Sequence, residues 1–254
     1  MKKLSVVIIA RNEEANLPRC LNSVKWADEI LIGDCGSTDR TVEIAQSYGA
    51  RIVTYEWTGF GPAKQTVSEQ AEGEWVLSLD ADEEVTDKLA EEIKAAVSSD
   101  RGVAGYSIRR RTLFLGRWMY HGGWYPDWVT RLYRRECGRI SGNAVHEGIA
   151  VDGPIARFNN DLLHYSYPTL EIYLQKLNRY TALAAQEALD RGQHASGWKI
   201  VANPCAKFIK QYVLRAGFLD GIEGFVLAVL SAGYVMIKYT KLWHLQRRST
   251  KAAG

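Results

Sequence analysis

The chain has 254 residues with a net charge of +3, and 46% of them are hydrophobic and 24% are charged, as in an ordinary soluble protein. This length is enough for one large domain with a full core, or for one domain and an appendage. The longest apolar run, Phe225–Ile237, has about 13 residues, whereas a membrane-spanning helix needs about 20, so we expect no spanning segment.

The charge is distributed unevenly along the chain. Residues 199–254 contain nine Lys or Arg against two acidic residues, a net charge of +7, which leaves −4 for residues 1–198. A basic segment that is also rich in aromatic residues indicates contact with an anionic surface such as phospholipid, lipopolysaccharide or nucleic acid.

The four cysteines show no Cys-x-x-Cys spacing and no grouping with histidine, which favours free thiols in a reducing compartment. The N-terminus passes from Met1-Lys2-Lys3 directly into a short apolar strand, without the apolar core and cleavage site of a signal peptide. Both observations predict a cytoplasmic protein.

The first hundred residues alternate between strand and helix patterns with short connections. Strands are expected at residues 4–10, 29–33, 51–55 and 75–79. Helices are expected with Leu17, Cys20, Leu21 and Val24 on an inner face, through Val42–Tyr48, at residues 62–71, and after a cap at Thr86. This alternation predicts an α/β fold with a mainly parallel sheet flanked by helices.

The pattern changes after residue 105. Strand-like segments at 106–114 and 129–134 are separated by loops rich in Gly and Trp, and a helix is expected over 169–191. We therefore predict two units, an α/β domain over residues 1–167 and a helical, amphipathic extension over 168–254. Short apolar stretches flanked by Lys, Arg, Trp and Tyr favour monotopic membrane attachment by the extension. A helix pair that packs on the α/β domain or forms a dimer interface is the alternative.

Asp80-Ala81-Asp82 directly follows the apolar run 75–79. A buried strand that ends in two carboxylates places negative charge at the carboxyl edge of the sheet, where open α/β proteins bind ligands. A divalent cation would relieve the repulsion between the carboxylates, and such oxygen ligands suit Mg²⁺ or Mn²⁺ on a diphosphate. The alternative is a solvated acidic turn, because Glu83 and Glu84 follow.

Polar groups follow each of the four predicted strands. They are Ala10-Arg11-Asn12-Glu13-Glu14, then Asp34-Cys35-Gly36-Ser37-Thr38-Asp39, then Gly59, Gly61 and Lys64, and finally Asp80-Ala81-Asp82. Each group could be a helix cap or a solvated loop. Their coincidence at one sheet edge favours a ligand site.

Three of these segments resemble the successive signatures of inverting family 2 glycosyltransferases, which have the GT-A fold. They are Val7–Glu14, Asp34–Thr41 and Asp80–Glu83. The resemblance covers about residues 4–150. Later motifs are similar to bacterial lipopolysaccharide core glucosyltransferases, which add glucose to an inner-core heptose. These motifs are Gly122–Asp127, Arg131–Arg135 and Val145-His146-Glu147.

The resemblance implies a nucleotide-sugar site and a metal. The donor would contact Ala10, Arg11, Asn12, Glu13, Asp34, Lys64, Asp80, Ala81 and Asp82. Asp34 would bind the base, expected to be uracil, although Cys35 stands where many members have a second acid. Lys64 would counter the phosphate charge and Asp80 would approach the ribose. Asp82, together with Asp80, would bind Mn²⁺ or Mg²⁺.

An inverting transfer also needs a base that takes the proton of the acceptor hydroxyl. The resemblance favours Glu147, with Asp127 as the second candidate. The alternative for Glu147 is a loop acid paired with one of the nearby arginines. His146 could orient Glu147 or contact the diphosphate, and His164 is a weaker candidate for such a contact.

These residues predict a metal-dependent glycosyltransferase that moves a sugar, expected to be glucose, from a UDP-sugar to a lipid-anchored surface glycan. Lipopolysaccharide core is the expected acceptor, and another envelope glycan is the alternative. The expected partners are the donor, this acceptor and the cytoplasmic face of the inner membrane, without nucleic acid; a second copy of the chain is a further candidate.

Two other classes of protein are alternatives. A sugar-1-phosphate nucleotidyltransferase would need a Gly-rich, Arg-containing loop where Arg11-Asn12-Glu13-Glu14 stands, so it is disfavoured. A non-catalytic membrane protein that binds nucleotide sugars is the other alternative, and it would bind the ligand without turnover.

Overall fold

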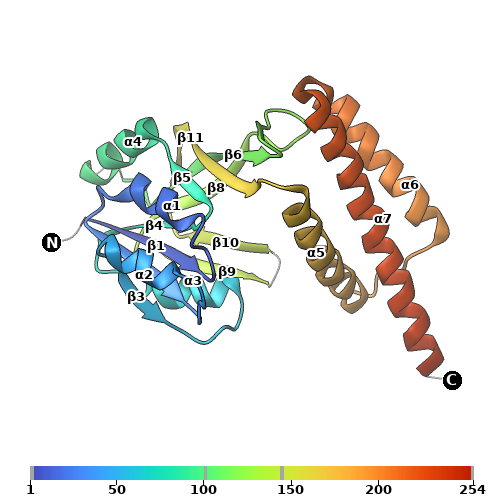
Figure 1. Ribbon diagram of the computed structural model, residues 1–254, viewed down its shortest axis with the longest axis horizontal. Coiled ribbons are helices and arrows are strands. Elements are labelled where there is room, and N and C mark those ends of the chain that lie inside the picture. The colour runs from blue at the N-terminus through green and yellow to red at the C-terminus, as the bar shows by residue number, and fades with distance from the viewer. Residues whose placement is uncertain (1–2, 100–101, 144–145, 253–254) are drawn as a thin grey trace. The chain divides into compact units, whose positions relative to one another are not determined.

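The structure is a computed structural model that describes residues 3–99, 102–143 and 146–252 (Figure 1). The chain separates into two compact units. The first contains Met1–Arg111 and Asp127–Tyr165, and the second contains Thr112–Pro126 and Ser166–Gly254. Strands β6 and β11 each continue from the first unit into the second.

The first unit is built on a mixed sheet. Its strands are β1 (Leu4–Ala10), β2 (Glu29–Asp34), β3 (Arg51–Thr54), β4 (Trp75–Asp80), β5 (Glu83–Val85), β6 (Gly105–Phe114), β8 (Asp127–Arg134) and β11 (Ile155–Tyr167). In the described chain the strand order is β3-β2-β1-β4-β8-β6-β11-β5. A separate antiparallel pair consists of β9 (Gly138–Asn143) and β10 (His146–Val151).

The N-terminal half of this sheet is parallel, as the alternation of strands and helices predicts. Strands β3, β2, β1 and β4 run in the same direction, whereas β8 pairs antiparallel with β4 and β6, and β11 pairs antiparallel with β5. Strands β1 and β2 are almost fully buried, which explains their continuous apolar sequence. The predicted α/β class is therefore correct, and the antiparallel half follows the change of pattern after residue 105.

Four helices accompany the parallel half: α1 (Leu17–Val24), α2 (Thr41–Ser47), α3 (Phe60–Ser68) and α4 (Asp87–Ser98). The inner face predicted for α1 is confirmed, because Leu17, Cys20, Leu21 and Val24 are its buried residues. The cap predicted for α4 is confirmed too, since the Thr86 side chain accepts a hydrogen bond from the Leu89 backbone N–H. Helix α3 begins two residues before the expected position and ends three residues before it.

The second unit is mainly helical. It contains β7 (Arg117–Trp118), α5 (Leu170–Asp190), α6 (Gly197–Phe208), a π-helix η1 (Ile209–Leu214), a short 3₁₀ helix η2 (Gly217–Asp220) and α7 (Gly221–Ala252). Helices α5 and α6 both pack against α7. A core cluster of the second unit contains Phe114, Met119, Tyr173, Leu177 and Leu227. Helix α6 was not predicted; it has Pro204 in its interior and buries no residue fully.

The expectation that no segment could span a membrane is wrong by length and composition. In the described chain one helical segment, Gly217–Arg248, is long and apolar enough to cross a membrane, and 28% of its apolar stretch is buried. The apolar run Phe225–Ile237 lies within α7, which begins directly after η2, so the helical segment is longer than the run itself.

Candidate active site

The carboxyl ends of β1, β2 and β4 lie side by side. Ala10 pairs with Asp34 across β1 and β2, and Ile9 pairs with Asp80 across β1 and β4. The loops that follow these three strands therefore start at neighbouring positions of one sheet edge. In a parallel sheet this edge is the usual place for a ligand.

The loops after β1 and β2 are held together by hydrogen bonds. The Asn12 side-chain oxygen accepts a bond of 2.8 Å from the Thr38 N–H, and the Asn12 N–H donates to Ser37 Oγ at 3.0 Å. The Glu13 N–H donates to Thr41 Oγ1 at 2.8 Å. Asn12 has a positive φ of 56°, which an Asn tolerates better than most residues. Arg11 is exposed in the same loop.

Asp34 lies at the end of β2 and is largely buried. Its carboxylate accepts hydrogen bonds from the N–H groups of Gly36 (2.9 Å) and Ser37 (3.2 Å) and from Ser37 Oγ (2.5 Å). The side chain thus has a fixed orientation and organises the loop after β2. Cys35 is half-buried beside it, and its contact with Tyr55, together with burial, raises the pKa of that phenol.

Two cations hold the carboxylate of Asp80. The Lys64 ammonium lies 2.7 Å from Oδ1, and Arg131 Nη2 lies 2.5 Å from Oδ2. Lys64 is only 2% exposed on α3, and Arg131 is buried on β8. Burial disfavours a charged carboxylate, but the charges of Arg131 and Lys64 outweigh it and hold the pKa of Asp80 well below its usual range.

Glu83 is completely buried beneath this site, so the alternative of a solvated acidic turn is wrong for it. Its carboxylate accepts a hydrogen bond of 2.9 Å from the Asp80 N–H and lies 2.6 Å from Arg131 Nη2. Arg110 also reaches it, at 3.3 Å. Sequence reasoning missed Glu83 as a site residue. The signal available was its position directly after Asp82, in a strand where every second residue turns inward.

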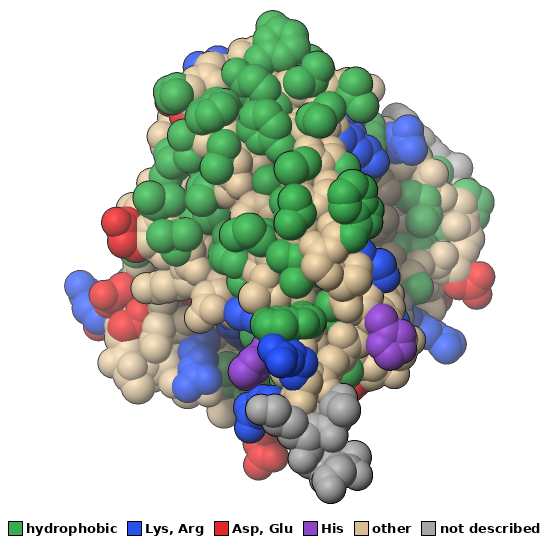
Figure 2. All heavy atoms as spheres, turned by 90° about the vertical axis from the view of Figure 1, so that its right-hand side faces the viewer, with side chains coloured by type: hydrophobic (Ala, Val, Ile, Leu, Met, Phe, Trp, Pro, Cys, Tyr) green, Lys and Arg blue, Asp and Glu red, His purple; other side chains and the backbone are tan. Residues whose placement is uncertain are grey.

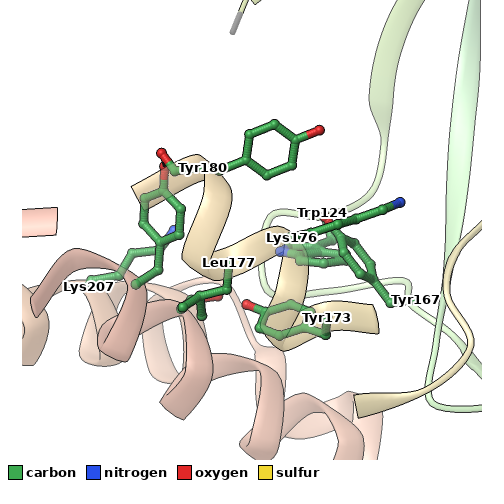
Figure 3. A pocket seen from close by; sticks show the side chains of 9 residues that line it. Trp124, Tyr167, Tyr173, Lys176, Leu177, Tyr180 and Lys207 are labelled. Carbon is green, nitrogen blue, oxygen red and sulfur yellow. Dashed lines mark hydrogen bonds between the residues drawn. The ribbon is translucent and has the colours of Figure 1, made fainter. Parts of the chain in front are cut away.

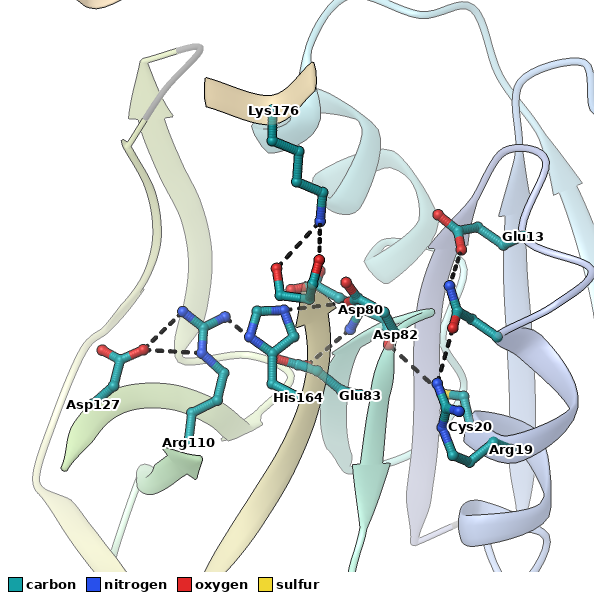
Figure 4. A network of polar contacts seen from close by, with 12 residues as sticks. Glu13, Arg19, Cys20, Asp80, Asp82, Glu83, Arg110, Asp127, His164 and Lys176 are labelled. Carbon is teal, nitrogen blue, oxygen red and sulfur yellow. Dashed lines mark hydrogen bonds and ion pairs between the residues drawn. The ribbon is translucent and has the colours of Figure 1, made fainter. Parts of the chain in front are cut away.

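Asp82 and His164 face each other (Figure 4). Asp82 Oδ1 lies 3.4 Å from His164 Nε2, and the Asp82 carbonyl accepts a hydrogen bond of 2.9 Å from the Tyr165 N–H. Ala81, between the two acids, is buried. Asp82 with His164 offers one oxygen and one nitrogen atom that could bind a divalent metal. Within the described ranges no group of three or more His, Cys, Asp or Glu could hold a metal ion.

Asp127, the second candidate for the base, begins β8 and has a 40% exposed side chain. Arg110 donates two hydrogen bonds to its Oδ2, from Nε at 2.9 Å and from Nη2 at 2.8 Å. This leaves Oδ1 to take a proton. The neighbouring Arg109 and Arg111 lie 3.1 and 3.5 Å from the carboxylate of Asp161, so the three arginines each approach an acid.

Glu147, the first candidate for the base, lies on β10, where its backbone pairs with Gly142 on β9. The side chains of Glu147 and His146 lie outside the described part of the structure, as does Val145 altogether. The role predicted for Glu147 therefore stays a prediction.

This topology, with acids and a lysine after the parallel strands, is the GT-A type of glycosyltransferase. A family model described as "Glycosyl transferase family 2" matches residues 5–151. The chain belongs to this family and is a glycosyltransferase.

Two relatives in bacteria are similar over nearly the whole chain. "Lipopolysaccharide core biosynthesis glycosyltransferase LpsC" of Rhizobium meliloti (strain 1021) is 31% identical over 261 residues, which cover 98% of this chain and 94% of that protein. "Uncharacterized glycosyltransferase RT0209" of Rickettsia typhi is 30% identical over 262 residues, covering 98% and 89%.

A similar solved structure is glucosyl-3-phosphoglycerate synthase from Mycobacterium tuberculosis, in complex with Mn²⁺, uridine-diphosphate and phosphoglyceric acid. It has a TM-score of 0.50 and 18% sequence identity, and the match covers 77% of this chain and 81% of that one. At this identity the likeness shows the fold, which agrees with the GT-A assignment.

Proposed function

We propose that the protein transfers a sugar, expected to be glucose, from a UDP-sugar to a hydroxyl of a lipid-anchored surface glycan of the lipopolysaccharide core type. The observation that carries the proposal is the side-by-side position of Ala10, Asp34 and Asp80 at one sheet edge. The name of the Rhizobium relative supports the acceptor, and the uridine-diphosphate in the mycobacterial structure supports the donor.

The donor would lie along this edge. Asp34, already oriented by its loop, would accept a hydrogen bond from uracil, and Asp80 would approach the ribose. Lys64 and Arg131 pair with Asp80, and Arg131 also pairs with the buried Glu83. The two cations therefore balance the two carboxylates, and a metal at Asp82 would supply the positive charge for a diphosphate.

The residues present fit a divalent metal, Mn²⁺ or Mg²⁺. Asp82 would be its principal protein ligand, because the two cations on Asp80 already neutralise that carboxylate. His164, 3.4 Å from Asp82, would supply a nitrogen ligand or orient the carboxylate. When bound, the metal supplies positive charge that stabilises the leaving diphosphate.

The acceptor hydroxyl must lose a proton as its oxygen attacks the anomeric carbon. We propose Glu147 as the base and keep Asp127 as the second candidate. Arg110 binds one oxygen of Asp127 with two hydrogen bonds, and this contact fixes the side chain in place. The same contact lowers the number of oxygens free for a proton, which favours Glu147.

We further propose that residues 168–254 contact the cytoplasmic face of the inner membrane. Large hydrophobic side chains are exposed on η1, η2 and the start of α7. This apolar face consists of Ile209, Val213, Leu214, Phe218, Leu219 and Ile222. Figure 2 shows hydrophobic side chains gathered on this side of the molecule, with Lys and Arg side chains nearby. Lys210 and Arg215 flank the apolar face and would pair with lipid phosphates.

The test of the donor proposal is calorimetric titration with UDP-glucose, UDP-galactose, UDP-N-acetylglucosamine and GDP-mannose, each with Mn²⁺ and with EDTA. We expect one UDP-sugar to bind and EDTA to abolish the binding. The matched control is Glu91→Gln, which replaces an exposed carboxylate on α4 and should bind like the wild type. Absence of binding across the panel, or equal binding with EDTA, would contradict the proposal.

A further inference from the structure

The second unit contains an aromatic pocket of its own, of about 200 Å³. It is lined by Trp124, Tyr167, Tyr173, Lys176, Leu177, Tyr180, Lys207, Ser231 and Tyr234. All these residues belong to the second unit, and they come from the loop before β8, the end of β11 and helices α5, α6 and α7. This volume is below the range of about 300–1,000 Å³ that drug-sized ligands need, and it suits one sugar unit.

The aromatic side chains form a continuous wall. The ring centroids of Trp124 and Tyr167 lie 5.6 Å apart, and those of Tyr167 and Tyr173 lie 5.0 Å apart. The Lys176 ammonium lies 5.2 Å from the Tyr167 ring and donates to both oxygens of Ser166 at 3.2 Å. Tyrosine and tryptophan combine an apolar face with a polar group, which suits a ligand with C–H faces and hydroxyls.

Lys207 lies at the other end of the pocket from Trp124 and Tyr167 (Figure 3). In the described part of the chain, no acidic side chain lines the pocket with it. Burial lowers the pKa of Lys207, and the positive charges of Arg215 and Lys210 lower it further. The positive charge of Lys207 at one end of an aromatic pocket favours an anionic group there.

The Gly122-Gly123 motif builds this arrangement. Both glycines have positive φ, 66° and 77°, and the Gly122 N–H donates to the Arg215 carbonyl at 2.8 Å. A Cβ at Gly123 would lie only 2.2 Å from Arg215 Nη1, so a side chain there would displace the arginine. The glycines therefore let the loop that carries Trp124 approach Arg215 closely.

From this geometry we infer that the pocket binds a sugar that carries a phosphate group, with the sugar ring against the aromatic wall and the phosphate at Lys207. An ammonium group binds phosphate as a point charge, and aromatic rings pack on the apolar face of a sugar. This inference goes beyond the proposed transfer reaction. It is tested by binding alone and does not depend on the donor proposal.

The experiment is a calorimetric titration of the full chain with glucose 6-phosphate, with saturating UDP and Mn²⁺ present to occupy the donor site. Glucose and inorganic phosphate are titrated in parallel. We expect glucose 6-phosphate to bind at least tenfold more tightly than either. Equal binding of glucose 6-phosphate and phosphate would show that charge alone acts, and would overturn the inference, as would no binding.

Variants identify the pocket. Lys207→Gln should weaken glucose 6-phosphate binding about tenfold or more, the effect expected for loss of a hydrogen bond to a charged group, and Lys207→Arg should retain most of it. The matched control is Lys199→Gln, an exposed lysine on the same helix α6 that does not line the pocket. Thermal unfolding of each variant checks that it folds. Equal affinity of Lys207→Gln and Lys199→Gln would overturn the inference.

A lipid headgroup offers the same phosphate chemistry without the sugar. Binding to phosphatidylglycerol vesicles is therefore measured for the wild type and Lys207→Gln. Vesicle binding that is independent of Lys207 supports the sugar phosphate as ligand. Vesicle binding that depends on Lys207, together with no binding of glucose 6-phosphate, would assign the pocket to a lipid headgroup and overturn the inference.

Discussion

The ammonium group of Lys64 on α3 lies 2.7 Å from Oδ1 of Asp80 at the end of β4. The pair joins a helix to the strand that precedes the predicted metal ligand, and Arg131 from β8 completes it on the other carboxylate oxygen. Three elements that are distant in the sequence are therefore fixed by a single carboxylate. The arrangement positions Asp80 and, two residues later, Asp82.

Lys64→Met should destabilise the protein and weaken donor binding. The substitution removes one of two cations from a largely buried carboxylate, and such a loss costs about 1–3 kcal/mol of unfolding free energy. Urea unfolding measures it, with Lys88→Met, an exposed lysine on α4, as the control. The double variant Lys64→Met/Asp80→Asn should lose less than the sum of the single variants. Additive losses would show that the two side chains do not interact.

The stability of the protein should fall in acid because of Asp80. Its folded pKa lies well below the unfolded value of about 3.9, so the folded state binds fewer protons than the unfolded chain in this range. The stabilisation is fully present above the unfolded pKa and is lost as the pH falls toward the folded pKa. Urea unfolding between pH 6 and pH 3 should therefore show a smaller acid loss for Asp80→Asn than for the wild type. Parallel pH profiles would contradict this assignment.

Asp82→Asn should abolish the metal dependence of donor binding, because it removes the principal proposed oxygen ligand. His164→Gln should weaken the affinity for Mn²⁺ by about 10–100-fold, the effect typical of losing a side chain that orients a metal ligand. Titration of UDP-glucose at several Mn²⁺ concentrations measures both. Glu84→Gln is the control, since Glu84 accepts a hydrogen bond from Tyr165 rather than facing His164. Unchanged Mn²⁺ dependence in Asp82→Asn would exclude it as a ligand.

The parallel half of the fold could be predicted from the sequence because its strands are apolar on both faces and its helices carry regular apolar stripes. Leu17, Cys20, Leu21 and Val24 repeat at helical spacing, and all four are buried. The same regularity placed Asp34 and Asp80 at one sheet edge. Local sequence determines these features, so they can be predicted from one amino-acid sequence.

The partners of Asp80 could not be predicted, because they depend on contacts between distant elements. Arg131 lies 51 residues after Asp80, and no local pattern distinguishes it from the other arginines near it. The burial of Glu83 also depends on distant contacts. A charged side chain is expected to be exposed, but two arginines and a backbone N–H offset the cost of burying this carboxylate.

Glu147→Gln and Asp127→Asn distinguish the two candidates for the base. The variant that removes the base should keep donor binding and lose transfer by about 10²–10⁴-fold. We expect this result for Glu147→Gln. Asp127→Asn should have a smaller effect, because its main contact is with Arg110. The measurements are single-turnover transfer and calorimetric donor binding. A larger loss of transfer in Asp127→Asn would reverse the assignment.

The apolar face on η1 and η2 should bind anionic membranes. The double variant Leu214→Glu/Leu219→Glu adds two negative charges to side chains that are 75% and 53% exposed, so the fold should tolerate it. Both the apolar contact and the attraction between Lys210, Arg215 and the lipid phosphates would weaken. We expect cosedimentation with phosphatidylglycerol vesicles to fall at least tenfold. Leu174→Glu, at an exposed leucine on α5 outside this face, is the control and should bind like the wild type. If the double variant keeps wild-type binding, the face does not contact the membrane. A second copy of the chain is then the partner to test, by comparing the oligomeric state of the wild type and the double variant.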